Sequence, residues 1–169
     1  LDSGHDIAAV VTQPDRLGGR GRHAQLPPTK LFAQEHGLAV LQPTSLRHQE
    51  AQTTLRALTP EIMVVAAYGK ILPPAILKIP PNGVVNIHPS LLPRHRGPSP
   101  VANAILCGDE TIGVSIMLLD EGMDTGPLLA QQSLDLYPND ELYKTTPSQL
   151  HTKTTGELTP QLFDLGAQL

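Results

Sequence analysis

The chain has 169 residues, of which 40% are apolar and 17% charged, which is enough for one domain with a buried core and excludes gross disorder. It contains no run of eighteen apolar residues and does not open with a basic and then apolar segment, so we expect neither a transmembrane helix nor a secretory signal. The single cysteine, Cys107, excludes an internal disulfide and a cysteine-rich zinc site.

Continuous apolar runs alternate with helical patterns along the chain. Strands are predicted over residues 7–11, 38–41, 62–67, 84–88, 111–119 and 128–134, and the runs 7–11 and 62–67 are apolar throughout, as is typical of strands buried on both faces. Helices are predicted over residues 28–37, 45–58, 100–108 and 155–165, the third with Ser99 as its N-cap. Segments 13–28 and 137–160 are predicted to be loops. This order predicts an α/β fold with a mostly parallel, Rossmann-like sheet and helices on both faces.

The ligand of such a sheet lies beyond the carboxyl ends of its strands, so the polar residues that follow strands are the candidates for a functional site. Asn86 and His88 are two residues apart at the end of a strand and therefore point to the same face. A neutral donor beside a titratable imidazole suits a reaction that builds an oxyanion and moves a proton. Taken alone, His88 is better interpreted as a buried structural histidine at a strand end.

An acidic turn over residues 120–126 is the second candidate. Two glycines frame Asp124, so the backbone turns sharply there. A carboxylate at this place can hydrogen-bond His88 and fix its tautomer. The alternative interpretation is a solvated aspartate in a tight turn.

Three arginines, Arg16, Arg20 and Arg22, lie in a glycine-rich segment that matches neither a dinucleotide-binding nor a Walker pattern. These arginines can bind phosphates. The alternative interpretation is an ordinary solvated loop. Residues 1–108 hold ten basic and six acidic side chains, and residues 109–169 two basic and ten acidic ones. A chain of this acidic balance is not a general nucleic-acid binder, so contact with phosphate must come from a local patch.

No other pattern for catalysis is present. The seven histidines show no spacing typical of zinc, so we expect no metal, and there is no elbow for a nucleophilic serine. Group transfer in which the substrate supplies the nucleophile is the chemistry that remains.

At these residues the chain resembles the folate-dependent formyltransferases, in particular the members that formylate methionyl initiator tRNA. The resemblance is carried by the pattern Asn86-x-His88-Pro89-Ser90-Leu91-Leu92-Pro93 and by Asp124 in Asp-Thr-Gly. Stretches 11–16, 19–22, 41–43, 66–73 and 94–100 also fit. The similarity runs from about residue 5 to about residue 135, and the threonine-rich segment 144–160 fits poorly.

The resemblance implies a formyltransferase fold, with residues 1–169 forming a catalytic domain. Relatives carry one further strand and helix before this region and a β-barrel domain after it. We therefore expect a catalytic domain truncated at its N-terminus, without the C-terminal tRNA-binding domain. Because the missing strand would be central in the sheet, the stability of this piece by itself is in question.

The resemblance also implies a reaction, in which the formyl group of 10-formyltetrahydrofolate passes to the α-amine of methionyl initiator tRNA. Asn86 would stabilise the oxyanion, while His88 and Asp124 would handle protons. The folate would contact residues in three segments: Ala67, Tyr68, Gly69, Ile71 and Leu72; Ser90, Leu91, Leu92 and Pro93; and Gly122, Met123 and Thr125. Arg16, Arg20 and Arg22 would meet the tRNA.

Further expectations concern partners and location. We expect a monomer in the bacterial cytoplasm or an organellar matrix, with neither a membrane nor DNA as a partner. Two alternatives remain open: a folate-dependent transferase or hydrolase acting on a small amine, and a tRNA-binding fragment without activity.

Overall fold

A computed structural model describes residues 4–18, 23–136 and 154–169. In chain order the elements are β1 (Val10–Val11), β2 (Arg16–Gly18), β3 (His23–Gln25), α1 (Pro28–Glu35), β4 (Val40–Leu41), α2 (Gln49–Ala57), β5 (Met63–Ala66), α3 (Pro74–Leu77), β6 (Val84–His88), α4 (Pro100–Leu106), β7 (Thr111–Leu118), β8 (Leu128–Asp135) and α5 (Thr155–Gln168). The chain divides into two compact units, Leu1–Glu61 with Leu72–Asn82, and Ile62–Ile71 with Gly83–Leu169.

The first unit is built on the parallel pair β1 and β4, in which Val10 is opposite Val40. Helix α1 lies against both strands and buries Ala33. It begins at Pro28, whose fixed φ suits a first helical position, and Gly37 follows its end with a φ of 68°. The predicted bounds of this helix are therefore confirmed to within two residues.

The segment 13–28 is not simply the loop that its glycines and prolines predicted. Strands β2 and β3 pair in an antiparallel hairpin, with Arg16 opposite Gln25. Arg20 and Arg22 lie outside the described residues. The hairpin extends from the unit that contains β1 and β4, and it presents Arg16 to solvent.

The second unit contains a four-stranded sheet in the order β5-β6-β7-β8. Strands β5 and β6 are parallel, whereas β7 runs antiparallel to both β6 and β8. The predicted α/β class is confirmed, and β6 coincides with the predicted strand 84–88. The sheet is therefore mixed, with one parallel pair and two antiparallel pairs. A purely parallel sheet would have given β7 the opposite orientation.

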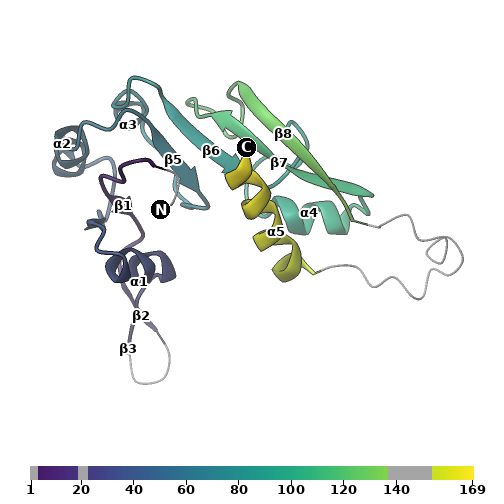
Figure 1. Ribbon diagram of the computed structural model, residues 1–169, viewed down its shortest axis with the longest axis horizontal. Coiled ribbons are helices and arrows are strands. Elements are labelled where there is room, and N and C mark those ends of the chain that lie inside the picture. Colours follow the sequence, from purple (N-terminus) through teal and green to yellow (C-terminus); the bar gives the residue numbers. More distant parts are fainter. Residues whose placement is uncertain (1–3, 19–22, 137–153) are drawn as a thin grey trace, which may run out of the picture. The chain divides into compact units, whose positions relative to one another are not determined.

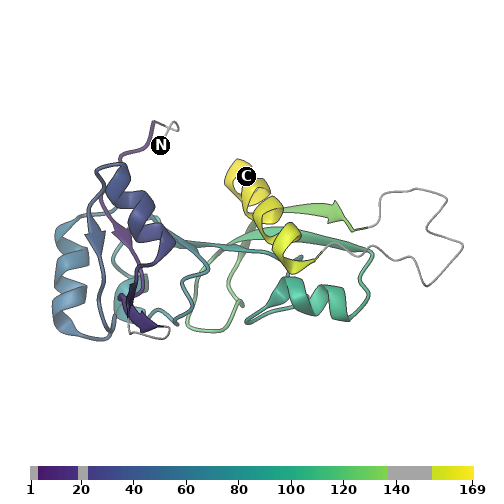
Figure 2. The same cartoon turned by 90° about the horizontal axis from the view of Figure 1, so that it is seen from below.

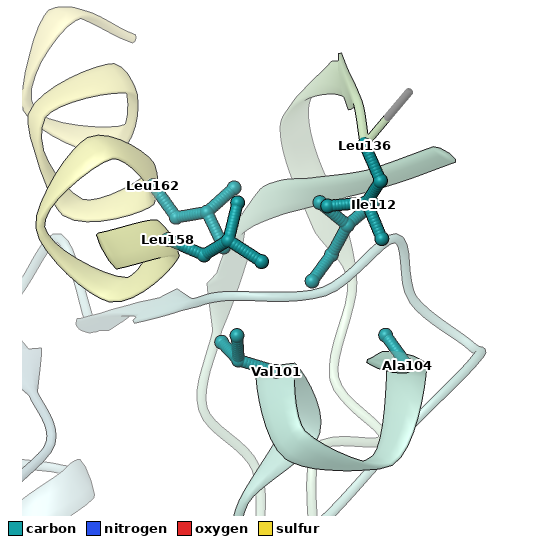
Figure 3. Close-up of a cluster of buried hydrophobic side chains, with 6 residues drawn as sticks. All are labelled: Val101, Ala104, Ile112, Leu136, Leu158 and Leu162. Carbon is teal, nitrogen blue, oxygen red and sulfur yellow. The ribbon is translucent and has the colours of Figure 1, made fainter. Parts of the chain in front are cut away.

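Helix α5 packs on this sheet and contacts β6, β7 and β8. Its Gly166 approaches the sheet so closely that a Cβ there would lie 2.6 Å from Cγ2 of Ile87. Helices α4 and α5 lie side by side in both ribbon views (Figure 1, Figure 2). Figure 3 shows the apolar cluster that they share with the sheet, formed by Val101, Ala104, Ile112, Leu136, Leu158 and Leu162.

Side-chain caps account for some helix ends and not for others. Thr154 and Glu157 form a reciprocal capping box at the start of α5, and Pro160 sits inside that helix. Ser99 precedes α4 as predicted, but it makes no side-chain cap and has a φ of 61°. None of the described helices is long and apolar enough to cross a membrane.

Candidate active site

Asn86 and His88 project from the face of β6 that lies opposite α5. Ile87, between them, packs towards α5, and side chains alternate along a strand. His88 is 5% exposed, whereas Asn86 is half-buried and its side chain makes no hydrogen bond within the described part of the chain. The amide of Asn86 is therefore available to a ligand oxygen beside a buried imidazole.

The structure brings Asp124 to His88. Oδ2 of Asp124 lies 3.7 Å from Nδ1 of His88, and the two side chains are 13% and 7% exposed. This proximity does not come from neighbouring carboxyl ends of parallel strands. Strand β7 is antiparallel to β6 and ends at Leu118, opposite Val85, so the following turn must return along β6 to reach His88.

The tautomer of His88 is set by the backbone of His95. Nε2 of His88 lies 3.0 Å from the carbonyl oxygen of His95. A carbonyl oxygen only accepts, so Nε2 carries the proton and donates it. In the neutral ring the lone pair is then on Nδ1, which faces Asp124. This arrangement corrects the expectation that Asp124 fixes the tautomer by a hydrogen bond.

Asp124 is itself held by a backbone donor. The N–H of Gly97 donates to its Oδ2 at 2.7 Å. Asp124 has a φ of 51°, a left-handed conformation that costs a non-glycine residue about 1–3 kcal/mol and is often retained at functional sites. The turn also depends on Gly126, where a Cβ would collide with the carbonyl oxygen of Leu118. The local backbone thus places this carboxylate against the imidazole.

Residues 122–125 form the rest of the same turn. Oδ1 of Asp120 accepts from the Gly122 N–H at 2.9 Å and from the Thr125 hydroxyl at 2.7 Å. Met123 is 55% exposed at the surface of the turn. Of the three predicted folate contacts here, Met123 has its side chain most available, while the Thr125 hydroxyl is engaged in bracing the turn.

The segment after His88 is tied to β7 by a buried hydroxyl. Oγ of Ser115 donates to the carbonyl of Ser90 at 2.6 Å and accepts from the N–H of Leu92 at 3.0 Å. The Ser90 hydroxyl donates to the carbonyl of Arg94 at 2.7 Å. Ser90 and Leu92 are therefore buried parts of the scaffold, whereas Leu91 is half-buried and Pro93 exposed.

Residues 67–71 follow β5 at the same edge of the sheet as His88, because β5 and β6 are parallel and Ala66 is opposite Ile87. The backbone turns here through left-handed conformations at Ala67 and Gly69. Burial raises the pKa of the Tyr68 hydroxyl. Ile71 is 69% exposed. Leu72 belongs to the first compact unit.

Arg16 stands on the hairpin of the first unit, next to a braced aspartate. Asp15 accepts from Lys30 at 2.6 Å and from Gln42 at 2.7 Å. These bonds, that from Gln42 first, hold the pKa of the Asp15 carboxyl below its usual range. The base of the arginine-bearing segment is thereby fixed to α1 and to the residue after β4.

Among the described residues, the predicted site residues belong neither to a metal-binding cluster nor to the cavity of the first unit. No group of three or more histidine, cysteine, aspartate or glutamate side chains is arranged to hold a metal ion there. A cavity of about 310 Å³ is present in the first unit and is lined by residues between Leu41 and Leu55. None of the predicted site residues lines it.

Sequence reasoning found the polar side chains of the site but missed the groups that orient them. The carbonyl of His95 and the N–H of Gly97 are backbone groups, which every such residue carries, so composition gives no sign of them. The only sequence signal was their place in the stretch 94–100, which carried part of the family resemblance.

Comparisons with known proteins show which proteins this chain is similar to. A family model described as Formyl transferase matches residues 2–159. Methionyl-tRNA formyltransferase of Chloroflexus aggregans is 55% identical over 167 residues, which are 99% of this chain and 50% of that protein. The enzyme of the same name from Dehalococcoides mccartyi strain CBDB1 is 55% identical over 147 residues, 87% of this chain and 46% of that protein. The chain spans about half the length of these curated relatives.

Solved structures support the fold. Phosphoribosylglycinamide formyltransferase from Bacillus halodurans superposes with a TM-score of 0.71 at 24% identity, covering 98% of this chain and 77% of that one. A formyltetrahydrofolate deformylase from Pseudomonas syringae pv. tomato gives 0.62 at 22% identity, with 96% and 52% covered. The expected formyltransferase fold is confirmed.

Proposed function

The chain belongs to the formyl transferase family, and from this premise we propose that it transfers the formyl group of 10-formyltetrahydrofolate to the α-amine of methionyl initiator tRNA. The observation that carries the proposal is the buried pair of His88 and Asp124, with the proton of His88 held on Nε2. The 55% identity to proteins named methionyl-tRNA formyltransferase supports this choice of substrate.

The reaction needs a base and an oxyanion donor. The amine nitrogen attacks the formyl carbon, an N–C bond forms, and the carbonyl oxygen becomes an oxyanion. The bond from the formyl carbon to N10 of the folate then breaks, and N10 is protonated as tetrahydrofolate leaves. The proton lost by the amine balances the one gained by N10, so the protein needs only to relay it.

Nδ1 of His88 is the proposed proton acceptor. It carries the lone pair of the neutral ring, and the negative charge of the Asp124 carboxylate lies 3.7 Å away, where it offsets the positive charge that the ring gains as the proton is transferred. An α-amine has a pKa of about 7.7–8.0, so a large share is already unprotonated near neutral pH and modest help suffices. Positioned acid–base groups of this kind contribute about 100–10,000-fold to a rate.

Asn86 is the proposed oxyanion donor. It shares its face of β6 with His88, and its amide is not used within the described residues. Removing one such donor costs about 100–1000-fold in turnover. We expect Asn86→Ala to lower kcat by a factor in this range, with little change in folate affinity.

The co-substrates take different surfaces in this proposal. In this proposal the folate contacts residues 67–71, the segment 90–93 and the turn at residues 122–125, all of which belong to the same compact unit as His88. Leu72 joins this set only as a prediction. The tRNA contacts Arg16, Arg20 and Arg22 through its phosphates. A metal ion has no part in the mechanism.

The test is formation of formylmethionyl-tRNA by the full-length protein from 10-formyltetrahydrofolate. We expect product with methionyl initiator tRNA and none with a small amine such as glycinamide ribonucleotide. His88→Ala should abolish turnover while calorimetry with a folate analogue shows unchanged affinity. Formylation of the small amine alone would favour the small-amine alternative, and tRNA binding without folate binding would indicate an inactive RNA-binding fragment.

A further inference from the structure

Asp109 lies directly after α4 and bridges two side chains of the segment 94–97. One of its carboxylate oxygens lies 2.6 Å from Nε2 of His95, and the other accepts from the guanidinium of Arg94. The Asp109 side chain is only 8% exposed, and that of His95 11%. The hydrogen bond from His95, followed by the charge of Arg94, holds the pKa of the Asp109 carboxyl below its usual range.

The same short segment supplies both backbone contacts that orient the catalytic pair. The carbonyl of His95 accepts from Nε2 of His88 at 3.0 Å, and the N–H of Gly97 donates to Asp124 at 2.7 Å. Asp109 therefore holds, through side chains, the stretch of backbone that holds His88 and Asp124. It touches neither of them itself.

The conformation of this segment requires a restraint. His95 has a φ of 54°, in the left-handed region that is unfavourable for a residue with a Cβ. Such conformations persist where surrounding contacts over-determine them. Asp109 accepts charge-assisted hydrogen bonds from His95 and from its neighbour Arg94. These two bonds restrain the backbone of His95 in its left-handed conformation.

We propose that Asp109 is a positioning residue for catalysis: it fixes the 94–97 segment so that the His95 carbonyl keeps the proton of His88 on Nε2 and leaves Nδ1 free to act as the base. This inference rests on the proposed function only for the role of Nδ1. Without Asp109, the segment relaxes from its left-handed conformation, and the His88 proton distributes between the two ring nitrogens. A ring protonated on Nδ1 cannot accept the amine proton there.

A purely structural role predicts something different. Helix α4 is anchored in the core by Val101 and Ala104, independently of Asp109. If Asp109 only held α4 in place, its loss would lower the free energy of unfolding without changing the tautomer of His88. The tautomer therefore separates the two roles.

The experiment compares Asp109→Asn and Asp109→Ala with Glu110→Gln in the full-length protein. Glu110 is the adjacent, exposed acid, so its variant removes the same charge one residue away. The ¹⁵N chemical shifts of the His88 ring report the tautomer directly, assigned by comparison with His88→Gln. Steady-state kinetics at several pH values report kcat and the Michaelis constants separately.

We expect the wild-type protein and Glu110→Gln to show the Nε2-protonated ring, and both Asp109 variants to show a mixture of tautomers. Turnover of the Asp109 variants should fall by about 10–100-fold with little change in the Michaelis constant for folate, as expected for misplacement of a catalytic group. The pH dependence of kcat should change shape in the Asp109 variants alone.

Several outcomes overturn the proposal. The proposal is wrong if the His88 ring of the wild-type protein is protonated on Nδ1. It is also wrong if the tautomer of His88 is the same in Asp109→Asn as in the wild type. If Asp109→Ala does not fold, the nearly isosteric Asp109→Asn still decides the question. Failure of the proposed function has a separate signature, namely normal turnover in His88→Ala, and it leaves the tautomer measurement valid.

Discussion

Nδ1 of His88 lies 3.7 Å from Oδ2 of Asp124, although an antiparallel strand and a turn separate the two residues in the chain. The distance is that of an ion pair and not of a hydrogen bond. The hydrogen bond of this carboxylate goes to the N–H of Gly97. Asp124 therefore makes a structural contact with Gly97 and an electrostatic contact with His88. A substitution that keeps the first contact and removes the second distinguishes their effects.

Asp124→Asn should retain the structural contact and lose the charge. The asparagine oxygen still accepts from Gly97, and asparagine tolerates the left-handed backbone at this position. We expect turnover to fall by about 100-fold or more because the imidazolium of His88 is no longer stabilised. Asp124→Ala should lose turnover as well and also cost about 1–2 kcal/mol of unfolding free energy. Rates and chemical denaturation of both variants check this, and near-normal turnover in Asp124→Asn would contradict it.

Gly126→Ala should disrupt the turn that carries Asp124. The added Cβ meets the carbonyl oxygen of Leu118, a backbone atom that cannot rotate away, so the turn must shift. We expect a loss of about 1–3 kcal/mol in unfolding free energy and a fall in turnover.

Gly156→Ala in the first turn of α5 is the matched control. Its Cβ would meet only ordinary contacts, and alanine favours a helix by about 0.5–1 kcal/mol over glycine, so this variant should be as stable as the wild type or more so. Equal effects of the two substitutions would show that the turn at residue 126 has room after all.

Ser115→Ala should loosen the segment that follows His88. The buried hydroxyl bonds Ser90 and Leu92 and also accepts from Gln131 at 2.8 Å, and its loss leaves buried backbone groups without partners. An unsatisfied buried group costs about 1–3 kcal/mol. If residues 90–93 bind folate, affinity for a folate analogue should fall too. Ser133→Ala, on the exposed strand β8, is the control and should change neither stability nor affinity.

The pH dependence of stability should carry the signature of Asp109. Its native pKa is lowered from 3.8 by His95 and Arg94, so it contributes stability that is fully present above the unfolded pKa and is lost as pH falls through the native one. The difference in unfolding free energy between the wild type and Asp109→Asn should be constant above about pH 5 and shrink below pH 4. Denaturation series at several pH values measure it, and a difference that grew on acidification would reverse the sign of the argument.

The sequence predicted local features better than tertiary ones. Strand 84–88 was predicted correctly, and three of its five residues are the β-branched types Val84, Val85 and Ile87. The hairpin of β2 and β3 was missed because its glycines and arginines are also typical of a loop. The antiparallel course of β7 depends on which strand it meets, which no local pattern encodes. Helix α3 is too short for a periodic signal.

The same division holds at the candidate site. Asn86 and His88 were recognisable because alternation along a strand places them on one face. Asp109 was not recognised, because an aspartate after a helix and a glycine is typical of a solvated position. Asp109 is buried because Arg94 and His95 contact it, and these tertiary contacts cannot be read from the local sequence.

The last prediction concerns Arg16 and the two arginines that follow it. If these side chains contact phosphates of the tRNA acceptor end, replacing Arg16 with alanine should raise the Michaelis constant for tRNA and leave folate affinity unchanged. Arg16 is exposed on the hairpin, whose base is fixed by Asp15, so the substitution removes a charge without disturbing the fold. Each lost phosphate contact should lower the salt dependence of tRNA affinity by about 0.7–0.9 units of slope.

Substituting both Arg20 and Arg22 should act in the same direction and more strongly, since two phosphate contacts are lost together. Arg56→Ala is the control for the single Arg16 substitution, because Arg56 is an exposed arginine in the last turn of α2 and each of these two variants removes one positive charge. Initial rates against tRNA concentration at several salt concentrations give both the Michaelis constant and the slope. If the Arg20 and Arg22 double variant kept both values of the wild type, the hairpin would have no part in tRNA recognition, and a small amine would become the better-supported substrate.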